Sequence, residues 1–448
     1  MPIVTTAETP RTLRLLNKTD FPGWLDQLPQ AIAAWVRDHG FEAAPARKLV
    51  LPGETGGIAG AVIGSRGDGF ADGAAAASLP PLDWQIEGEC TEAFGLGFLM
   101  EQYRFDRFRQ KKTVSPNPRL VIADTALKAR LEAINGGISL ARDLINLPAN
   151  HLNPQGLEDE ARTLAEAYDA SITVISGEQL ERDFPAIDVV GRAAESPPRL
   201  IDMRWGETGP MITLVGKGVT FDSGGLDLKP SSAMEMMKKD MGGAAITLGL
   251  TRTIMALGLP LRLRVLVPVA ENAVSDKSFR PLDVIETAAG IPVEVGNTDA
   301  EGRLILADAL HLATSEEPEL LIDFATLTGA ARVAVGTELP ALFSNDRALS
   351  AEFVEAGDAA GDPLWPMPLH QPYERFLDGG HTALSSTGAS RYGGAITAAL
   401  FLQRFLQKPV PWAHIDVMAW NLASRPGYPK GGEAMGLRAA LRLVEGKL

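Results

Sequence analysis

From about residue 150 onward, short apolar runs alternate with helical patterns, and this alternation constrains the fold more than any other feature. The runs are SITVISG, PMITLVGKGVTF, RLRVLVPVA, ELLIDFAT and WAHIDVMAW. Runs that are apolar on both faces are typical of strands covered by helices on both sides, in a largely parallel sheet. We therefore expect an α/β domain whose functional groups gather at the carboxyl ends of its strands.

The length of the chain predicts two domains, because 448 residues exceed one ordinary core. Between residues 127 and 145 an apolar residue recurs every three or four positions, which predicts a long connector helix. Asp124 or Thr125 would start this helix, and NLPANHLNP would stop it. We expect a smaller N-terminal α/β domain at 1–118, the connector at 119–147 and a larger C-terminal α/β domain at 148–448.

The N-terminal part mixes helix and strand signals. Residues 24–41 and 91–105 have helical spacing, although Pro29 weakens the beginning of the first segment. RKLVLPG and GIAGAVIGS are short runs bounded by glycine and predict strands. No histidines, cysteines or carboxylates cluster here, so the sequence assigns this part no chemistry.

Bulk properties exclude several classes of protein. The net charge of −14 argues against a general nucleic-acid binder, and we interpret the one basic cluster, at 103–112, as a solvated helix end. No run of 18 apolar residues appears, and the N-terminus lacks a basic segment followed by an apolar one, so we expect no membrane span and no secretory signal. The single cysteine, Cys90, excludes an intrachain disulfide and indicates a reducing cytoplasm.

The octapeptide NTDAEGRL, residues 297–304, places charged side chains at alternate positions where the helix LILADALHLA must begin. One interpretation is a capped helix end, with Asn297 or Thr298 as the cap and acidic residues in the first turn. A second interpretation is functional, because Asn297, Asp222 and Thr326 each follow a strand-like run. We therefore expect these three residues to meet at one edge of the sheet.

A second charged segment, residues 216–245, carries in order Lys217, Asp222, Lys229 and Asp240. Ser232 and Glu235 have the spacing of a capping box, which predicts a helix that contains Asp240. The run GGAA after Asp240 permits close packing, so we expect Asp240 to be buried. A buried carboxylate without a partner is costly, and this segment therefore needs cations.

Two kinds of site satisfy this need. Four carboxylates are involved: Asp222, Asp240, Asp299 and Glu301. They could form a structural network with Lys217, Lys229 and Arg303, or they could bind Mn, Mg or Zn, and spacing alone leaves both open. No HExxH or CxxC motif is present, and we interpret His414, beside Asp416, and His311 as structural.

Together with VGKGVTFDSGG, MKKDMGGAA and ATLTGA, the octapeptide resembles the leucyl (cytosol) aminopeptidases, the dinuclear metallo-exopeptidases of the M17 type. The resemblance covers roughly residues 137–448, whereas the N-terminal part resembles the family only loosely. It implies that residues 148–448 form a catalytic metallopeptidase domain. It also implies an enzyme that releases N-terminal, leucine-like residues from peptides by attack of a hydroxide bridging two metal ions.

The resemblance implies a role for each matching residue. Two divalent ions, Mn or Zn with Mg or Co as alternatives, would be bound by Lys217, Asp222, Asp240, Asp299 and Glu301. Asp222 and Glu301 would bridge the two ions. Lys229 and Arg303 would be the catalytic cations, and Arg303 would hold a bicarbonate ion with the backbone at Leu327. Met237 would line the pocket for the N-terminal side chain.

The balance of charge favours the metal site. Two divalent ions neutralise the four carboxylates and leave Lys229 and Arg303 as surplus positive charge aimed at an oxyanion, which a structural network does not need. The resemblance also implies a homohexamer. Two other functions stay open. One is another two-metal hydrolase such as a phosphoesterase, although no GxxxxGK[ST] loop is present, and the other is a DNA-binding or architectural role, against which the net charge argues.

Overall fold

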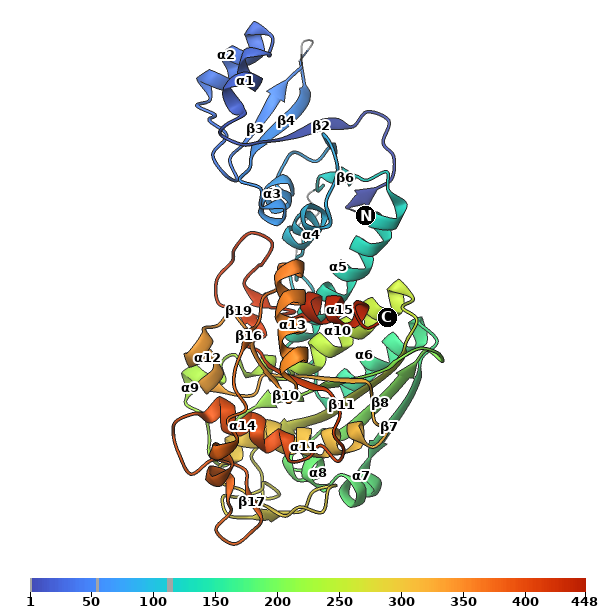
Figure 1. The fold of residues 1–448 in the computed structure, drawn as a ribbon, viewed down its shortest axis with the longest axis vertical. Helices are drawn as coiled ribbons and strands as arrows, with labels where there is room; N and C mark the ends of the chain where they lie inside the picture. The colour runs from blue at the N-terminus through green and yellow to red at the C-terminus, as the bar shows by residue number, and fades with distance from the viewer. Residues whose placement is uncertain (1, 54–55, 111–115) are drawn as a thin grey trace. The chain divides into compact units, whose positions relative to one another are not determined.

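The computed structural model describes residues 2–53, 56–110 and 116–448, and the chain divides into two compact units (Figure 1). One unit comprises Met1–Asn135 with Ala423–Lys430, and the other comprises Gly136–Leu422 with Gly431–Leu448. Both units combine strands with helices, so the predicted α/β class is confirmed.

The N-terminal unit contains a six-stranded sheet in the order β1-β6-β5-β2-β4-β3. All neighbouring strands are parallel except β3 and β4. The strands are β1 (Ile3–Val4), β2 (Arg11–Leu16), β3 (Lys48–Pro52), β4 (Ile58–Gly64), β5 (Asp83–Ile86) and β6 (Arg119–Val121). The helices are α1 (Phe21–Asp26), α2 (Gln30–Asp38), α3 (Gly69–Ala76) and α4 (Glu92–Glu101).

Two helical predictions for this unit need adjustment. The segment 24–41 forms α1 and α2 rather than one helix, because Pro29 stands between them as the N-cap of α2. The basic cluster begins after the end of α4, where residues 103–110 form no helix, and its last two residues, Lys111 and Lys112, lie outside the described residues.

The short segment 423–430 belongs to the N-terminal unit although it lies near the end of the chain. The backbone N–H of Gly427 donates to the Glu101 carboxylate over 2.6 Å. The ring of Tyr428 lies against Phe70, with 5.2 Å between the ring centroids. These contacts explain why the segment groups with residues so distant in sequence.

The predicted connector helix is α5 (Thr125–Asn146). The Asp124 carboxylate accepts the backbone N–H groups of Ala126 and Leu127, at 2.8 and 3.1 Å, and therefore caps the helix as predicted. The buried side chains follow the predicted spacing: Leu131, Ile134, Ile138, Ala141 and Ile145.

The larger unit is built on a nine-stranded sheet in the order β16-β15-β18-β14-β9-β11-β8-β7, with β10 paired to β11. Strands β18, β14, β9 and β11 are parallel. Strands β7 and β8 pair antiparallel with their neighbours, and β15 is antiparallel to β18 but parallel to β16. The strands are β7 (Ser171–Ser176), β8 (Arg199–Trp205), β9 (Met211–Gly216), β10 (Gly218–Asp222), β11 (Arg262–Asn272), β14 (Leu320–Ala325), β15 (Ala341–Ser344), β16 (Trp365–Pro366) and β18 (Trp412–Asp416). All five predicted runs are strands of this sheet.

Helices cover both faces of this sheet. Helices α6 (Pro154–Ala167) and α10 (Gly242–Leu257) lie on one face, and α8 (Pro185–Gly191) and α11 (Glu301–Thr314) lie on the other (Figure 1). Gly243 allows α10 to approach closely, because a Cβ atom there would lie 2.1 Å from the Phe324 carbonyl oxygen on β14.

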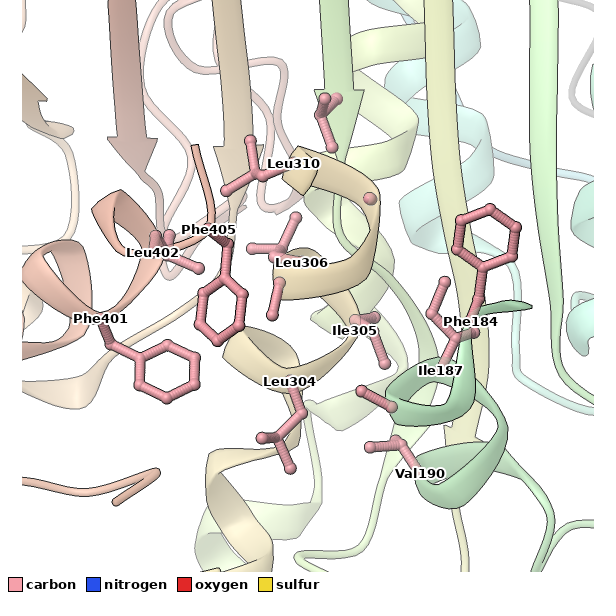
Figure 2. Packing of buried hydrophobic residues seen from close by; sticks show 14 of the residues in the cluster. Phe184, Ile187, Val190, Leu304, Ile305, Leu306, Leu310, Phe401, Leu402 and Phe405 are labelled. Atoms are coloured by element: carbon pink, nitrogen blue, oxygen red, sulfur yellow. The ribbon is translucent and has the colours of Figure 1, made fainter. Parts of the chain in front are cut away.

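Helix α11 is fixed by apolar side chains on both sides (Figure 2). Its Leu304, Ile305, Leu306 and Leu310 are fully buried. Phe184, Ile187 and Val190, from the start and body of α8, pack on one side, and Phe401, Leu402 and Phe405, from α14 (Gly394–Gln403) and the residues after it, pack on the other. This packing sets the position of the helix N-terminus, where NTDAEGRL lies.

Smaller elements complete the unit. They are α7 (Gly177–Asp183), α12 (Gly329–Val335), α13 (Arg347–Ala360), α15 (Leu437–Glu445), the 3-10 helix η3 (Gln371–Leu377), the sheet β12 (Val284–Ile285)-β13 (Val293–Glu294)-β17 (Leu384–Ser385) and the pair β19 (Trp420–Asn421)-β20 (Gly431–Gly432). Asn297 follows β13, so the expectation that it ends a strand of the main sheet is wrong. Along the described ranges, no helix combines the length and the apolar character needed to cross a membrane.

Candidate metal centre

Lys217 is the centre of the first group of charges. It lies between β9 and β10, with only 2% of its surface exposed. Its Nζ lies 2.6 Å from Asp240 Oδ2 and 2.9 Å from Glu301 Oε1, and it donates to the Thr326 carbonyl oxygen over 3.1 Å. Three segments far apart in sequence therefore meet around one buried amine.

Lys229 is the centre of the second group. Its Nζ lies 2.8 Å from Asp222 Oδ2 and also contacts the Asp299 carboxylate. Asp222, Asp299 and Glu301 each offer one carboxylate oxygen, and these three oxygens lie within 4.8 Å of one another. All five predicted ligands therefore surround one small volume, together with Lys229.

The carboxylates are crowded enough to disturb their protonation. Burial and the nearby Asp240 raise the pKa of Asp222 to about 6. Burial and Asp222 raise the pKa of Glu301 well above its ordinary value. Burial lowers the pKa of Lys217, but Asp240 and Glu301 raise it further than burial lowers it. The group is therefore short of positive charge even with two lysines present.

One oxygen in this group lacks a partner. Within the described part of the chain, Glu301 Oε2 is buried and accepts no hydrogen bond. A buried acceptor left unpaired is unfavourable, and carboxylate oxygens are ligands that divalent cations prefer. The donor set, the crowding and the unpaired oxygen all fit divalent metal ions better than a closed salt-bridge network.

The local structure of NTDAEGRL combines both interpretations given above. The Asn297 side chain accepts the backbone N–H of Asp299 over 2.7 Å and caps a single 3-10 turn, η2 (Thr298–Ala300). Helix α11 begins immediately afterwards, at Glu301. Asn297 is thus a cap, and this cap holds Asp299 and Glu301 on successive turns facing the same group of charges.

The segment around Asp240 differs from its prediction. Helix α9 (Ser231–Met234) has Pro230 as its N-cap, and no side chain caps it, so the capping box of Ser232 and Glu235 is wrong. Asp240 instead lies on a separate 3-10 helix, η1 (Met237–Met241), and α10 begins after that. The prediction that Asp240 is buried is confirmed, with 3% of its surface exposed.

The other predicted site residues are Arg303, Leu327 and Met237, which lie on the segments that carry the candidate ligands or next to them. Arg303, on the first turn of α11, donates from Nη1 to the Ser386 carbonyl oxygen over 2.7 Å, and burial lowers its pKa to about 10. Its buried Nε has no hydrogen-bond partner among the described residues. The backbone N–H of Leu327 donates to Asp416 over 3.0 Å, and Met237 is buried on η1, one 3-10 turn before Asp240.

Two further residues support the site, and of these Asn272 was missed in the sequence, whereas Thr326 was expected near Asp222. Asn272, at the end of β11, donates from Nδ2 to Asp222 Oδ1 over 2.8 Å and to the Thr298 carbonyl oxygen over 3.1 Å. The Thr326 hydroxyl donates to Asp240 Oδ1 over 2.8 Å. Asn272 ends an apolar run just as Asp222 does, and this shared placement was a usable signal.

The two histidines interpreted as structural each contact a residue outside the candidate ligand set. His414 Nδ1 lies 2.6 Å from Asp323 Oδ1, so its partner is Asp323 rather than Asp416. His311 Nε2 lies 2.6 Å from the Gln407 side chain.

Comparisons with known proteins agree with this geometry. The model of the "Cytosol aminopeptidase family, catalytic domain" matches residues 139–441, and the model of the "M17 aminopeptidase, N-terminal domain" matches residues 11–123. A probable cytosol aminopeptidase of Syntrophotalea carbinolica is 42% identical over 367 residues, which cover 78% of this chain and 73% of that protein. One from Chlorobium limicola is 34% identical and covers 90% of each chain.

Solved structures are similar over nearly the whole chain. The crystal structure of a cytosol aminopeptidase from Coxiella burnetii has a TM-score of 0.95 and 41% identity, and covers 99% of each chain. The bottromycin maturation enzyme BotP, in complex with Mn, has a TM-score of 0.87 and 30% identity, covering 98% of this chain and 99% of its own. The chain therefore belongs to the cytosol aminopeptidase family, the M17 peptidases, and is a metal-dependent aminopeptidase acting on peptides.

Proposed function

We propose that this enzyme releases apolar, leucine-like N-terminal residues and that its five candidate ligands hold two divalent ions. The convergence of Asp222, Asp299 and Glu301 within 4.8 Å is the observation that carries this proposal. Lys217 and Asp240 would complete the ligand set, because Lys217 Nζ contacts both Glu301 Oε1 and Asp240 Oδ2. Manganese is the first choice, since the related bottromycin enzyme was solved with Mn, and zinc is the second.

When bound, the two ions supply Lewis acidity and a hydroxide nucleophile at neutral pH. Asp222 and Glu301 would hold the ions from the buried side, because each belongs to the close trio of oxygens and is buried. Lys217 would bind through its neutral amine, since adjacent dications strongly depress the pKa of an ammonium group. The four candidate carboxylates would then be committed as ligands, and none of these four would remain as a general base.

Lys229 would act on the substrate. Its Nζ contacts the carboxylates of Asp222 and Asp299. With those carboxylates acting as ligands, the Lys229 ammonium would donate to the carbonyl oxygen of the scissile peptide bond and would stabilise the charge that develops there. Met237 would contact the N-terminal side chain, and a flexible thioether suits an apolar pocket.

Arg303 would hold a bicarbonate ion that moves protons near the reacting carbonyl. Its buried, unpaired Nε supports an anion at this position. The backbone N–H of Leu327 already donates to Asp416. A bicarbonate ion beside Arg303 would therefore share this N–H with Asp416 or would contact another atom of Leu327. Measuring turnover in bicarbonate-free buffer, with and without added bicarbonate, tests this role; unchanged turnover in an Arg303→Lys variant would contradict it.

We also propose that the enzyme is a cytoplasmic homohexamer, as the family resemblance implies. Light scattering on active protein should give about six times the chain mass of 47.8 kDa. An active species with the mass of one chain would contradict the hexamer.

The reaction itself is tested with two chromogenic substrates. Protein freed of metal and reconstituted with Mn, Zn or Co should hydrolyse leucine p-nitroanilide and should leave p-nitrophenyl phosphate intact. Phosphatase activity without peptidase activity would instead favour a different two-metal hydrolase. A salt-dependent shift of duplex DNA would revive the nucleic-acid role.

A further inference from the structure

Asp416, at the carboxyl end of β18, holds the turn that follows β14. Its Oδ1 accepts the backbone N–H groups of Leu327 and Thr328, at 3.0 and 3.2 Å. Its Oδ2 accepts the Thr328 hydroxyl over 2.6 Å. Asp416 is only 4% exposed, and its carboxylate therefore accepts three hydrogen bonds from this one turn while shielded from water.

The same turn contacts two of the five candidate ligands. The Thr326 carbonyl oxygen accepts from Lys217 Nζ over 3.1 Å, and the Thr326 hydroxyl donates to Asp240 Oδ1 over 2.8 Å. Thr326 is 3% exposed, so both contacts are shielded from water. A displacement of this turn would therefore move the amine of Lys217 and the carboxylate of Asp240 together.

We infer that Asp416 is a positioning residue for the metal centre, acting through Thr326 on Lys217 and Asp240. The inference rests on the proposed metal ligands. Groups that orient metal ligands by hydrogen bonds commonly change metal affinity or activity 10- to 100-fold when they are removed. Asp416 differs from such groups in one respect, because it holds the ligands through a backbone turn rather than directly.

The chain offers a matched control in Asp323. This carboxylate is also fully buried, on the neighbouring strand β14, and it accepts the Trp412 indole N–H over 2.7 Å and pairs with His414 at 2.6 Å. Among the described residues, neither Trp412 nor His414 has a hydrogen bond or an ion pair with a candidate ligand. Removing its charge should therefore disturb the sheet without moving the Thr326 turn.

The test measures manganese affinity by titration calorimetry on full-length protein freed of metal, with folding checked by circular dichroism. Asp416→Ala should weaken manganese binding 10- to 100-fold, because two backbone N–H groups lose their acceptor. Asp416→Asn should recover most of the affinity, since its amide oxygen can still accept both N–H groups. Asp323→Asn should lower Tm and leave the manganese Kd within about twofold of the unmodified chain.

A second route protects the test if Asp416→Ala fails to fold. Thr326→Val removes the contact with Asp240 and leaves Asp416 untouched, so it should weaken manganese binding in the same direction. Wild-type affinity in folded Asp416→Ala, or in Thr326→Val, overturns the inference. If the unmodified chain itself binds no manganese, the proposed function fails instead, and the two failures are thereby distinguished.

Discussion

Replacing Gly302 with alanine would separate the stability of helix α11 from the geometry of the metal centre. A Cβ atom at this position would lie 2.5 Å from Lys217 Cε, 2.6 Å from its Nζ and 2.8 Å from its Cδ. Ordinary contact requires about 3.4 Å, so the end of Lys217 must retreat by about 1 Å. That retreat would break its contacts with Asp240 and Glu301, at 2.6 and 2.9 Å.

The expected effects on stability and on activity are very different. The end of a lysine can move at small cost, and alanine favours a helix by about 1 kcal/mol over glycine, so the free energy of unfolding should change by less than about 2 kcal/mol. A ligand misplaced by about 1 Å can cost about 100-fold in rate. Gly302→Ala should therefore fold normally and lose about two orders of magnitude in kcat/KM.

Leucine p-nitroanilide kinetics at fixed free manganese, with calorimetric metal affinity and urea unfolding, would check this prediction. Gly23→Ala is the control, because no atom lies within 4 Å of the added Cβ on helix α1. It should keep wild-type activity and gain up to about 1 kcal/mol. If Gly302→Ala kept metal affinity and kcat/KM within threefold of the control, the position of the Lys217 amine would be irrelevant and its role as a ligand would be refuted.

Three further predictions address the other charged groups. Lys229→Ala should lower kcat by about 100- to 1000-fold and keep both metal ions, because its contact is needed for the transition state and not for the metals; lost metal with normal turnover per ion would argue against this role. Asp299→Ala should lower the number of manganese ions per chain measured by atomic emission, and an unchanged number would exclude it as a ligand. Asp308, buried on α11, accepts backbone N–H groups from Ala186, Ile187 and Ala288 at 2.9, 3.3 and 2.8 Å, yet burial raises its pKa to about 7. The folded state therefore binds a proton that the unfolded state has released, and stability from this group is lost as pH rises from about 4 to about 7, by about 4 kcal/mol. Urea unfolding at pH 5 and pH 8 compares the free energy of unfolding of the wild type with that of Asp308→Asn. The wild-type value minus the variant value should fall as pH rises, and a value that is the same at both pH values would mean that Asp308 stays ionised.

The fold class and the family could be predicted from the sequence, because both depend on local patterns of residues. Runs apolar on both faces became the central strands, and Asp124 became the cap of α5 as predicted. Strand β8 was missed because Asp202 and Arg204 interrupt its apolar residues; both pair with other charges in the fold, which no local pattern reveals.

The supporting contacts of the site could not be predicted, because they join residues far apart in the chain. The spacing of Ser232 and Glu235 indicated a capping box, but the chain there forms a single turn followed by the separate 3-10 helix that carries Asp240. Asn297 follows a strand as expected, yet that strand belongs to a small separate sheet. The octapeptide itself identified Asp299 and Glu301, whereas the roles of Asn272 and Asp416 depend on strand neighbours visible only in three dimensions.

The loop 423–430, grouped with the N-terminal unit, has a consequence for anyone who would divide this chain by expression of fragments. A fragment ending at residue 135 would lack the Tyr428 ring that packs on Phe70 and the Gly427 N–H that donates to Glu101. The remaining fragment would carry the same eight residues with nothing of their own unit to bind. Two soluble halves would be obtained more readily by moving this loop to the first fragment through a short linker than by any single cut.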